Sequence, residues 1–421
     1  MKDILVKKES IMNTERKISW PQYDTEQYLK AIKKVLETNR WALSGYWTGE
    51  SSAEQKFAKE FAHYCAVPYA VPTTSGTSAL SIALESLNIG YGDEVIVPAL
   101  TWLAPVTAIL GVNATPILAD VDPDTYCLDP SRLESLISEK TRAIIAIHLY
   151  GNMANMDEIS RIAKDNHLFV IEDCAQSHGA QWLGRKAGTI GDVGTFSFQQ
   201  GKAITSGEGG IAITSREDTY NKLQQLRSDS RTCARTTNKY GAMELVAKGE
   251  IQGSNYCMSE FQAALLQEQL EKLDEQIIQK ETNACCLKRL LEHVDGVKCL
   301  TKYQQNNIQS YYGFVIKFTQ EIDVNNICER LCEKLGVGDF FVHPVYPAVH
   351  KNVLFCPWTK KRYPKAIART EQFWRNINLP VAEHACDEAI VLHHSLLLQD
   401  HDVLVKIANE IMACIDENGK K

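Results

Sequence analysis

The chain has 421 residues, of which 44% are hydrophobic and 23% are charged, and its formal net charge is −7. A chain of this length predicts two domains, or one large domain with a smaller one attached. The acidic balance argues against a nucleic-acid partner, which requires a basic surface. No apolar run reaches the roughly 18 residues of a membrane-spanning helix, and the start of the chain lacks the apolar segment of a secretory signal. We therefore expect a cytoplasmic protein that acts on small molecules, without a membrane or nucleic-acid partner.

Thirteen cysteines are scattered along the chain, and their odd number argues against a disulfide framework. Cys285 and Cys286 are adjacent, and Cys328 and Cys332 are one helical turn apart, but no Cys-x-x-Cys pair is present. A metal site requires more ligands close together. We therefore expect free, structural cysteines and no metal.

Residues 1–25 are polar and unpatterned, which predicts an N-terminal arm. Over residues 26–275, apolar runs alternate with helical patterns and predict a large α/β domain. Helices are expected where Ala53, Phe57 and Phe61 recur at helical spacing, and over residues 79–87. Strands are expected over residues 94–99, 115–121, 143–150, 168–175, 194–198 and 210–214. Several are apolar on both faces, so the sheet is expected to be buried and mostly parallel.

A long amphipathic pattern begins at Met258 and continues to residue 281, in MSEFQAALLQEQLEKLDEQIIQKE. It predicts one long helix that links the large domain to a smaller one. We expect this smaller, C-terminal α+β domain to comprise residues 276–421.

Lys202 directly follows an apolar strand, within the glycine-rich stretch GTFSFQQGKAITSGEGG. Glycines let the backbone approach a ligand closely, and a desolvated lysine can lose its proton and form a Schiff base. Taken alone, such a lysine is more often a solvated loop residue. The neighbouring patterns decide between the two interpretations.

Asp173 stands at the end of the apolar strand in LFVIEDCAQSHGA, and ligands of open α/β sheets bind at the carboxyl ends of strands. A carboxylate there could keep a pyridine nitrogen protonated, as an electron-sink cofactor requires; a helix cap or a paired charge is the alternative. Gln176 and His178 follow in the same loop, where a histidine is more often a structural group.

A phosphate site is indicated by TTSGTSALSIAL, in which Ser75, Gly76, Thr77 and Ser78 open a helix. The first N–H groups of a helix bind anions, although an ordinary Ser or Thr cap would look the same. Trp102, in PALTWLAP, follows the next strand and could stack on a cofactor ring or pack in the core.

Together, these stretches resemble the DegT/DnrJ/EryC1/StrS family of sugar aminotransferases, from about Ile18 to the C-terminal segment. The resemblance implies a fold-type I enzyme that depends on pyridoxal 5′-phosphate, with pyridoxamine 5′-phosphate as its intermediate form. The family's S-F-x-x-x-K motif places the cofactor on Lys202 and a phosphate contact at Ser197. Its E-D-x-A-Q-x-x-G-A motif gives Asp173 as the ring-nitrogen partner, with Gln176 near the ring oxygen. Its S-G-T-x-A-L motif gives the amides of Thr77 and Ser78, and its P-x-x-T-[FW]-x-A motif gives the stacking Trp102.

The resemblance also implies a homodimer with shared active sites. GSNYCMSEFQAALL is similar to the family's G-x-N-x-R-M-S segment, in which Asn255 would reach the phosphate of the partner subunit. Cys257 stands where an arginine is common, so this part of the pattern departs. YPAVH at 346–350 is similar to a segment that shapes the substrate end of the pocket.

The run S-F-Q-Q-G-K with T-S-G-E-G-G is similar to the aminocyclitol branch of the family, whose members include glutamine:2-deoxy-scyllo-inosose aminotransferases. This implies an amino donor, L-glutamine, and a cyclic ketone acceptor of the 2-deoxy-scyllo-inosose type, in aminoglycoside biosynthesis. Gln199 and Gln200 could line a polyol site or merely bond to backbone. An aminotransferase for nucleotide-linked keto-sugars is the alternative. A family dehydratase would carry histidine in place of Lys202, and a PLP-binding regulator would need a DNA-binding domain.

Overall fold

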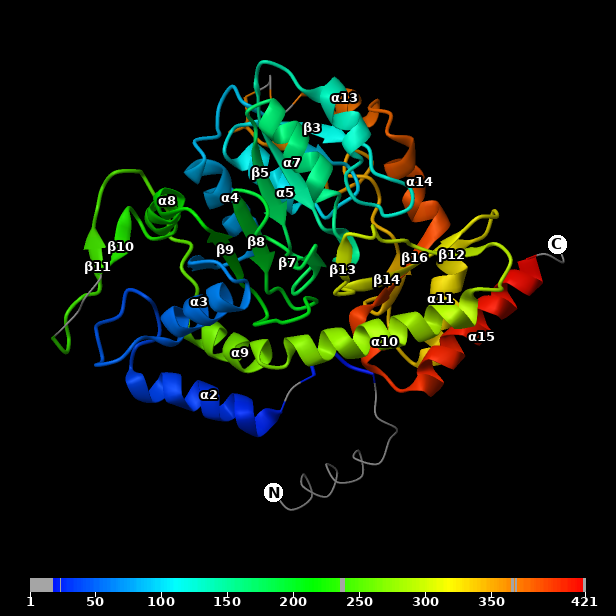
Figure 1. The fold of residues 1–421 in the computed structure, drawn as a ribbon, viewed down its shortest axis with the longest axis horizontal. Coiled ribbons are helices and arrows are strands. Elements are labelled where there is room, and N and C mark those ends of the chain that lie inside the picture. Colours follow the sequence, from blue (N-terminus) through cyan, green and yellow to red (C-terminus); the bar gives the residue numbers. More distant parts are fainter. Residues whose placement is uncertain (1–17, 23, 235–238, 365–366, 368, 419–421) are drawn as a thin grey trace.

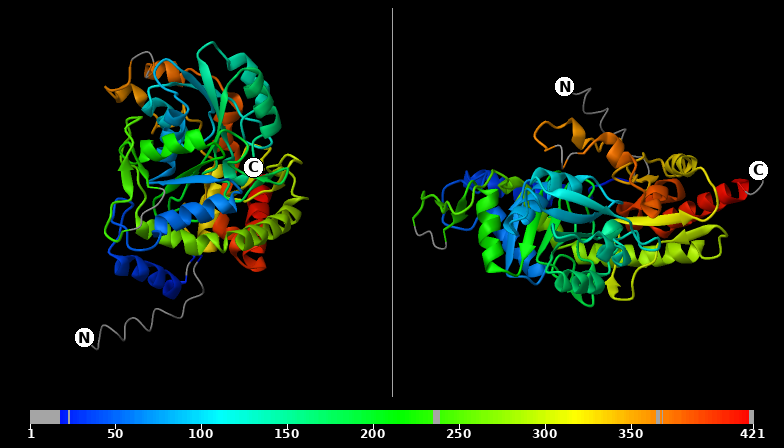
Figure 2. Two further views of the ribbon diagram at one scale, coloured as in Figure 1. Left: turned by 60° about the vertical axis from the view of Figure 1, so that its left-hand side comes forward. Right: turned by 90° about the horizontal axis from the view of Figure 1, so that it is seen from above.

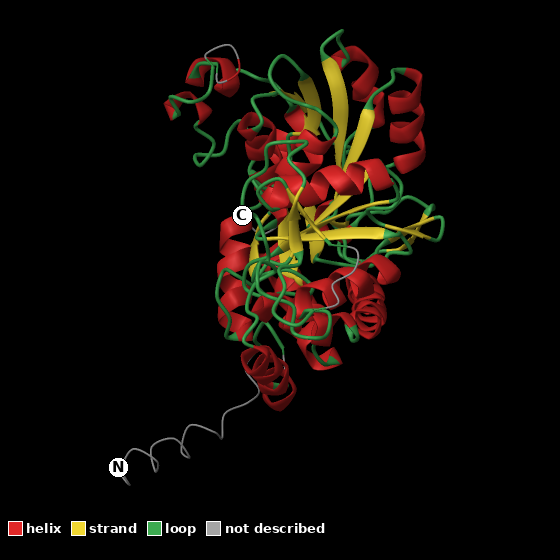
Figure 3. Ribbon diagram, turned by 90° about the vertical axis from the view of Figure 1, so that its left-hand side faces the viewer, coloured by secondary structure: helices red, strands yellow, loops and turns green. Residues whose placement is uncertain are grey.

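The computed structural model describes residues 18–22, 24–234, 239–364, 367 and 369–418. Most of the predicted N-terminal arm lies outside these residues. The described chain forms a large, mainly parallel sheet with helices around it (Figure 3), and a smaller, antiparallel sheet. The strands and helices predicted for the large domain are thereby confirmed as an α/β architecture.

The central sheet has seven strands in the order β1-β9-β8-β5-β4-β2-β3. Strand β9 alone is antiparallel to its neighbours, and the other six strands run in one direction. All six predicted strands are present. Strand β1 was not predicted, because Pro72 interrupts its strand pattern. A proline is tolerated there because β1 lies at the edge of the sheet. The strands are β1 (Tyr69–Thr73), β2 (Glu94–Pro98), β3 (Thr115–Ala119), β4 (Thr141–Ile147), β5 (Phe169–Asp173), β8 (Val193–Ser197) and β9 (Gly210–Thr214).

Helices with apolar faces cover this sheet, so that its central strands are almost fully buried. The two predicted helices correspond to α3 and α4. The helices of this part are α2 (Thr25–Thr38), α3 (Ala53–Tyr64), α4 (Gly76–Ser86), α5 (Ala104–Gly111), α6 (Leu133–Leu136), α7 (Met156–Asp165) and α8 (Glu217–Arg227). A hairpin of β10 (Arg231–Cys233) and β11 (Leu245–Ala247) projects from one side (Figure 1).

The smaller sheet is antiparallel, in the order β12-β14-β16-β15, and carries a separate core with α10, α11 and α15. Figure 2 shows its yellow and red helices at the end of the molecule opposite the N-terminal helices and the hairpin. Its elements are β12 (Val297–Cys299), β14 (Gly313–Phe318), α11 (Val324–Leu335), β15 (Val342–Pro344), β16 (Ala389–His393) and α15 (His401–Asn418). The intervening α13 (Glu371–Arg375) and α14 (Pro380–Glu388) follow a stretch that packs on the larger core. A short sheet of β13 (Asn306–Ile308), β6 (Gln181–Trp182) and β7 (Arg185–Lys186) bridges the two parts.

The single long helix predicted over residues 258–281 is wrong, because the structure has two helices there. Helix α9 (Glu260–Leu270) and helix α10 (Leu273–Leu291) lie nearly end to end below the sheet (Figure 1). At the break, the Lys272 N–H donates to the Gln269 carbonyl three residues back, at 3.1 Å, which tightens the turn. The Gln269 side chain is buried and bonds the backbone of Thr205 in the glycine-rich loop. Periodicity does not reveal such a break, because the apolar pattern continues across it.

None of the helices within the described ranges has both the length and the apolar character needed to cross a membrane. The boundary predicted at residue 275 stays a prediction.

Candidate active site

The carboxyl edge of the central sheet gathers the predicted site residues. Asp173 ends β5 and Ser197 ends β8, while Trp102 lies four residues after the end of β2. Helix α4 begins just beyond β1, at the same edge. Because these strands run in parallel, one edge of the sheet receives side chains from four separate stretches of sequence.

Lys202 lies in a tight turn after β8. Its N–H donates to the Gln199 carbonyl at 2.9 Å, and the Gln199 carboxamide oxygen accepts from the Gly201 N–H at 2.9 Å. The Lys202 Nζ lies 4.6 Å from the centre of the Tyr312 ring. Burial lowers the pKa of this amine, against the opposing influence of Tyr346 and Asp173. A lowered pKa makes the neutral, nucleophilic form of a lysine amine easier to reach.

Asp173 is a buried carboxylate that forms no salt bridge with any of the described residues. Its Oδ1 accepts the Ala175 N–H at 3.0 Å. Burial raises its pKa, although the Ala175 hydrogen bond and the nearby Lys202 amine oppose the rise. A protonated ring nitrogen placed against Asp173 would compensate the buried charge, so the residue fits the role of pyridinium partner.

His148 and Glu172 form a buried hydrogen-bonded pair next to Asp173. The His148 Nδ1 accepts the Ala154 N–H at 3.2 Å, so its Nε2 carries the proton and donates to Glu172 at 2.9 Å. Glu172 also accepts the N–H groups of Gly188, Ile190 and Gly191. Cys174 completes a potential metal-binding group with His148 and Glu172 among the described residues. The carboxylate oxygens are already satisfied by these four donors, which indicates a structural role.

Gln176 is fixed among aromatic side chains. Its oxygen accepts the Tyr150 N–H at 2.8 Å, and its amide nitrogen donates to the Tyr346 hydroxyl at 3.4 Å. Tyr346 in turn lies 6.0 Å from Trp102, ring centre to ring centre. Half of the Trp102 surface is exposed, so its face is free to cover a flat ligand.

The start of α4 forms a close-fitting cradle against Ser197. A Cβ on Gly76 would come within 2.7 Å of the Ser197 Cβ, so only glycine fits there. The side chains of Ser75 and Ser78 form a capping box, in which the Ser78 N–H donates to the Ser75 Oγ at 3.1 Å. The N–H groups at Gly76 and Thr77 precede the first intrahelical donor and point out of the helix. A phosphate fits these N–H groups and the Ser197 hydroxyl. At Ser78 it would have to displace the cap.

Asn255 lies on the exposed surface, outside this group of side chains. Its backbone pairs with Ser228 and its Oδ1 accepts the Cys257 N–H at 3.4 Å. The adjacent Tyr256 carbonyl accepts the Thr74 N–H at 2.9 Å, which brings the segment close to the start of α4.

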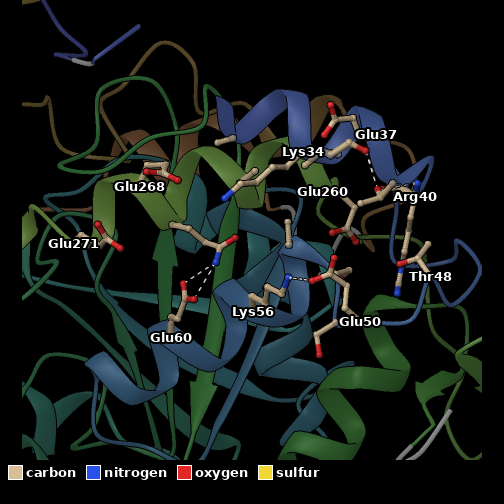
Figure 4. A pocket seen from close by; sticks show the side chains of 18 of the residues that line it. Lys34, Glu37, Arg40, Thr48, Glu50, Lys56, Glu60, Glu260, Glu268 and Glu271 are labelled. Carbon is tan, nitrogen blue, oxygen red and sulfur yellow. Dashed lines mark hydrogen bonds and ion pairs between the residues drawn. The ribbon is translucent and has the colours of Figure 1, made fainter. Parts of the chain in front are cut away.

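A cavity of about 700 Å³ lies elsewhere, between α2, α3 and α9 (Figure 4). Its charges are partly paired, since Lys56 contacts Glu50 at 2.6 Å and Gln267 bonds Glu60. None of the predicted site residues lines it. The active-site assignment therefore rests on the sheet edge alone.

Several residues of the site lie outside the motifs recognised in the sequence. Tyr312 and Tyr150 approach Lys202 and Gln176 from distant parts of the chain, and the sequence analysis missed both. His393 and His394, at the end of β16, were missed too, although an adjacent histidine pair after an apolar strand is a signal. Only Tyr346 lay in a segment that the sequence had linked to the pocket.

The fold and the residues at this edge define a pyridoxal phosphate-dependent aminotransferase. Residues 23–407 match the model of the DegT/DnrJ/EryC1/StrS aminotransferase family, and the chain belongs to this family.

Relatives and solved structures agree with this assignment. An L-glutamine:2-deoxy-scyllo-inosose aminotransferase from Streptoalloteichus tenebrarius is 40% identical over 410 residues, which cover 95% of each chain. One from Streptomyces fradiae is 41% identical over 397 residues, covering 93% of this chain and 92% of the relative. The crystal structure of 3-amino-5-hydroxybenzoic acid synthase superposes with a TM-score of 0.81 at 29% identity, over 95% of this chain and 98% of the other.

Proposed function

We propose that this aminotransferase transfers the amino group of L-glutamine to a keto-cyclitol of the 2-deoxy-scyllo-inosose type, as a step in aminoglycoside biosynthesis. The observation that carries the proposal is the identity of about 40%, over nearly the whole chain, with relatives of that activity. The matches cover more than nine-tenths of this chain and of each relative.

The arginines of the C-terminal third support an acceptor without a diphosphate. A nucleotide-linked sugar needs a cluster of free cationic side chains. Arg330 instead pairs with Glu410 and Glu417 at 2.7 Å each. Arg375 donates to the carbonyls of His350 and Asn352, while the guanidinium groups of Arg362 and Arg369 lie over the rings of Tyr363 and Phe373. These four cations are thus held in separate contacts, and they form no clamp.

Each residue at the sheet edge has a separate role in the proposed transamination. Pyridoxal phosphate, when bound, supplies the electron sink for breaking the bond between the donor's α-carbon and its hydrogen. Asp173 holds a proton on the ring nitrogen. Lys202 would anchor the cofactor, and its freed Nζ would take the proton from the donor α-carbon and deliver it to the cofactor carbon that carries the amine. With the ketone as second substrate, the same groups act in the reverse order.

The remaining contacts belong to the same proposal. The Thr77 N–H, the Ser197 hydroxyl and, once it is released from the Ser75 cap, the Ser78 N–H bind the phosphate. Trp102 stacks on the ring, and Gln176 lies near the ring oxygen. Support comes from the cradle at Gly76 and from the hydrogen bonds that orient Gln176.

We also propose a cytoplasmic homodimer in which Asn255 acts at the partner's phosphate. Large exposed hydrophobic side chains lie on the segment of the β10–β11 hairpin, which follows the isolated β-bridge between Ser228 and Asn255: Tyr240, Met243 and Val246. Such a patch is typical of an interface. All thirteen cysteines are free, which fits a reducing compartment.

The test is direct competition between a keto-cyclitol and nucleotide-linked keto-sugars, with L-glutamine as donor. We expect the higher kcat/KM for 2-deoxy-scyllo-inosose. A higher kcat/KM for a nucleotide-linked sugar would overturn the acceptor assignment and leave the aminotransferase in place. A variant with Arg362→Ala and Arg369→Ala serves as the control, because neither arginine should affect the cyclitol reaction.

A further inference from the structure

The backbone just before Lys202 is held by three ring N–H groups from outside its own loop. The Gly201 carbonyl faces the Nε2 atoms of both His393 and His394, each at 3.2 Å. The preceding carbonyl, at Gln200, accepts the indole N–H of Trp20 at 3.0 Å. Two consecutive peptide groups therefore receive donors from β16 and from the N-terminal segment.

The protonation of both histidines follows from their neighbours. The Ser395 N–H and hydroxyl both lie against the His393 Nδ1, at 3.3 and 2.8 Å. The proton of His393 is therefore on Nε2, directed at Gly201. The His394 Nε2 faces the same carbonyl and must also be the protonated nitrogen. Burial lowers the pKa of His393 to about 3 and that of His394 well below its usual value. Both rings are thus neutral donors, and a carbonyl oxygen has two lone pairs to receive them.

His394 is also bonded to Tyr312, whose ring lies near the Lys202 amine. Its backbone N–H donates to the Tyr312 carbonyl at 3.2 Å, and the Tyr312 ring lies 4.6 Å from the Lys202 Nζ. Trp20 packs edge-on against the His394 imidazole, 4.3 Å between ring centres. His394 therefore connects the backbone before Lys202 with the ring that covers its amine.

We infer that His393 and His394 are positioning residues, which orient the Lys202 amine by holding the Gly201 carbonyl and the Tyr312 ring in a fixed relation. The inference rests on the proposed role of Lys202. The hydrogen bonds of these two histidines to the Gly201 and Tyr312 carbonyls connect the end of β16, in the smaller sheet, with the surroundings of Lys202. Removing one N–H would leave the Gly201 carbonyl a single partner and allow the turn to rotate.

The first measurement uses the protein without cofactor and without substrate. The rate and pH dependence of Lys202 acetylation are followed by peptide mass spectrometry, with exposed Lys298 as an internal reference. His394→Phe keeps an aromatic ring against Trp20 but has no donor, whereas the His394→Gln amide nitrogen can reach the Nε2 position. We expect a change of about fivefold in the Lys202 rate for His394→Phe, as for one lost hydrogen bond, and recovery in His394→Gln.

The second measurement is turnover with saturating donor. We expect kcat to fall about tenfold in His394→Phe while the KM for the donor stays within about twofold, because orientation and not binding is affected. Unchanged Lys202 acetylation in a folded His394→Phe protein, or a His394→Gln variant no better than His394→Phe, would overturn the inference. If His394→Phe does not fold, Trp20→Phe removes the hydrogen bond to the Gln200 carbonyl and must also change the rate of Lys202 acetylation. A wrong acceptor assignment would leave the acetylation result untouched.

Discussion

Lys202 and Lys280 could each carry the cofactor on chemical grounds, and their surroundings separate them. Lys280, on α10, is fully buried, its Nζ lacks a hydrogen bond to any described residue, and burial lowers its pKa to about 7. Lys202 is the one that lies at the carboxyl edge of the sheet with Asp173. We predict that borohydride reduction fixes the cofactor to the Lys202 peptide, that Lys202→Ala abolishes turnover, and that Lys280→Met retains the covalent attachment. Cofactor recovered on the Lys280 peptide would contradict the assignment.

The charge of Asp173 is the second requirement at this scale. Asp173→Asn preserves the oxygen that accepts the Ala175 N–H but removes the negative charge that holds the ring proton. We expect kcat/KM to fall on the order of 100-fold or more, since each ~1.4 kcal/mol is a factor of ten. Asp218→Asn, at the exposed start of α8, is the matched control. A loss below about threefold in Asp173→Asn would mean that another group holds the proton.

At the scale of the element, the start of α4 depends on a residue with no side chain. Gly76→Ala forces its new Cβ against Ser197, and either the helix or the end of β8 must shift. We expect a destabilisation of roughly 1–3 kcal/mol and weaker cofactor retention on dialysis. Gly338→Ala is the control, because a Cβ there meets open space. Equal cofactor retention in the two variants would show that the cradle is not the phosphate site.

How much of this arrangement could be read from sequence depends on the element. Apolar strands that end in Asp173 or lead into Lys202 are local patterns, and they identified the carboxyl edge correctly. The capping box at Ser75 is equally local. At the turn between α9 and α10, the Gln269 side chain bonds the backbone of Thr205. The Gly201 carbonyl is held by His393 and His394, which lie almost 200 residues further along the chain. Contacts of that kind arise only after the sheets have packed, so no periodicity announces them.

For the whole molecule, the buried histidines His178, His393 and His394 imply sensitivity to acid. Burial lowers the pKa of His178 and of His393 to about 3, and that of His394 well below its usual value. The unfolded chain binds these protons near pH 6.5, so between about pH 6.5 and 3 it holds more protons than the folded chain, and stability falls as pH falls.

We predict a loss of unfolding free energy on the order of 2 kcal/mol per buried histidine between about pH 7.5 and pH 5, where carboxyl groups remain mostly ionised. Urea unfolding at both pH values measures it. His393→Gln should reduce the difference by roughly one histidine's share, and exposed His384→Gln should leave it unchanged. A free energy that does not change between the two pH values would show that these imidazoles take up protons while folded.

The proposed homodimer can be tested through Asn255. In one protomer its side chain is exposed, while its backbone runs beside the turn at Ser228 and the following Tyr256 bonds Thr74, just before α4. A partner subunit placed against the exposed hydrophobic patch could therefore receive Asn255 at its own phosphate site. We predict that Asn255→Ala weakens cofactor binding strongly, and that Lys202→Ala and Asn255→Ala chains complement each other when mixed.

The expected size of the complementation follows from symmetry. In a mixed dimer with shared sites, one site carries both defects and the other carries neither. Random exchange at equal concentrations makes half of the dimers mixed, so activity should return to about a quarter of the wild-type level. If Asn255 acted within its own chain, every site of the mixed dimer would retain one defect and no activity would return. Native mass spectrometry must show that exchange has occurred; mixed dimers without activity, or an active monomer by sedimentation, would rule out the shared site.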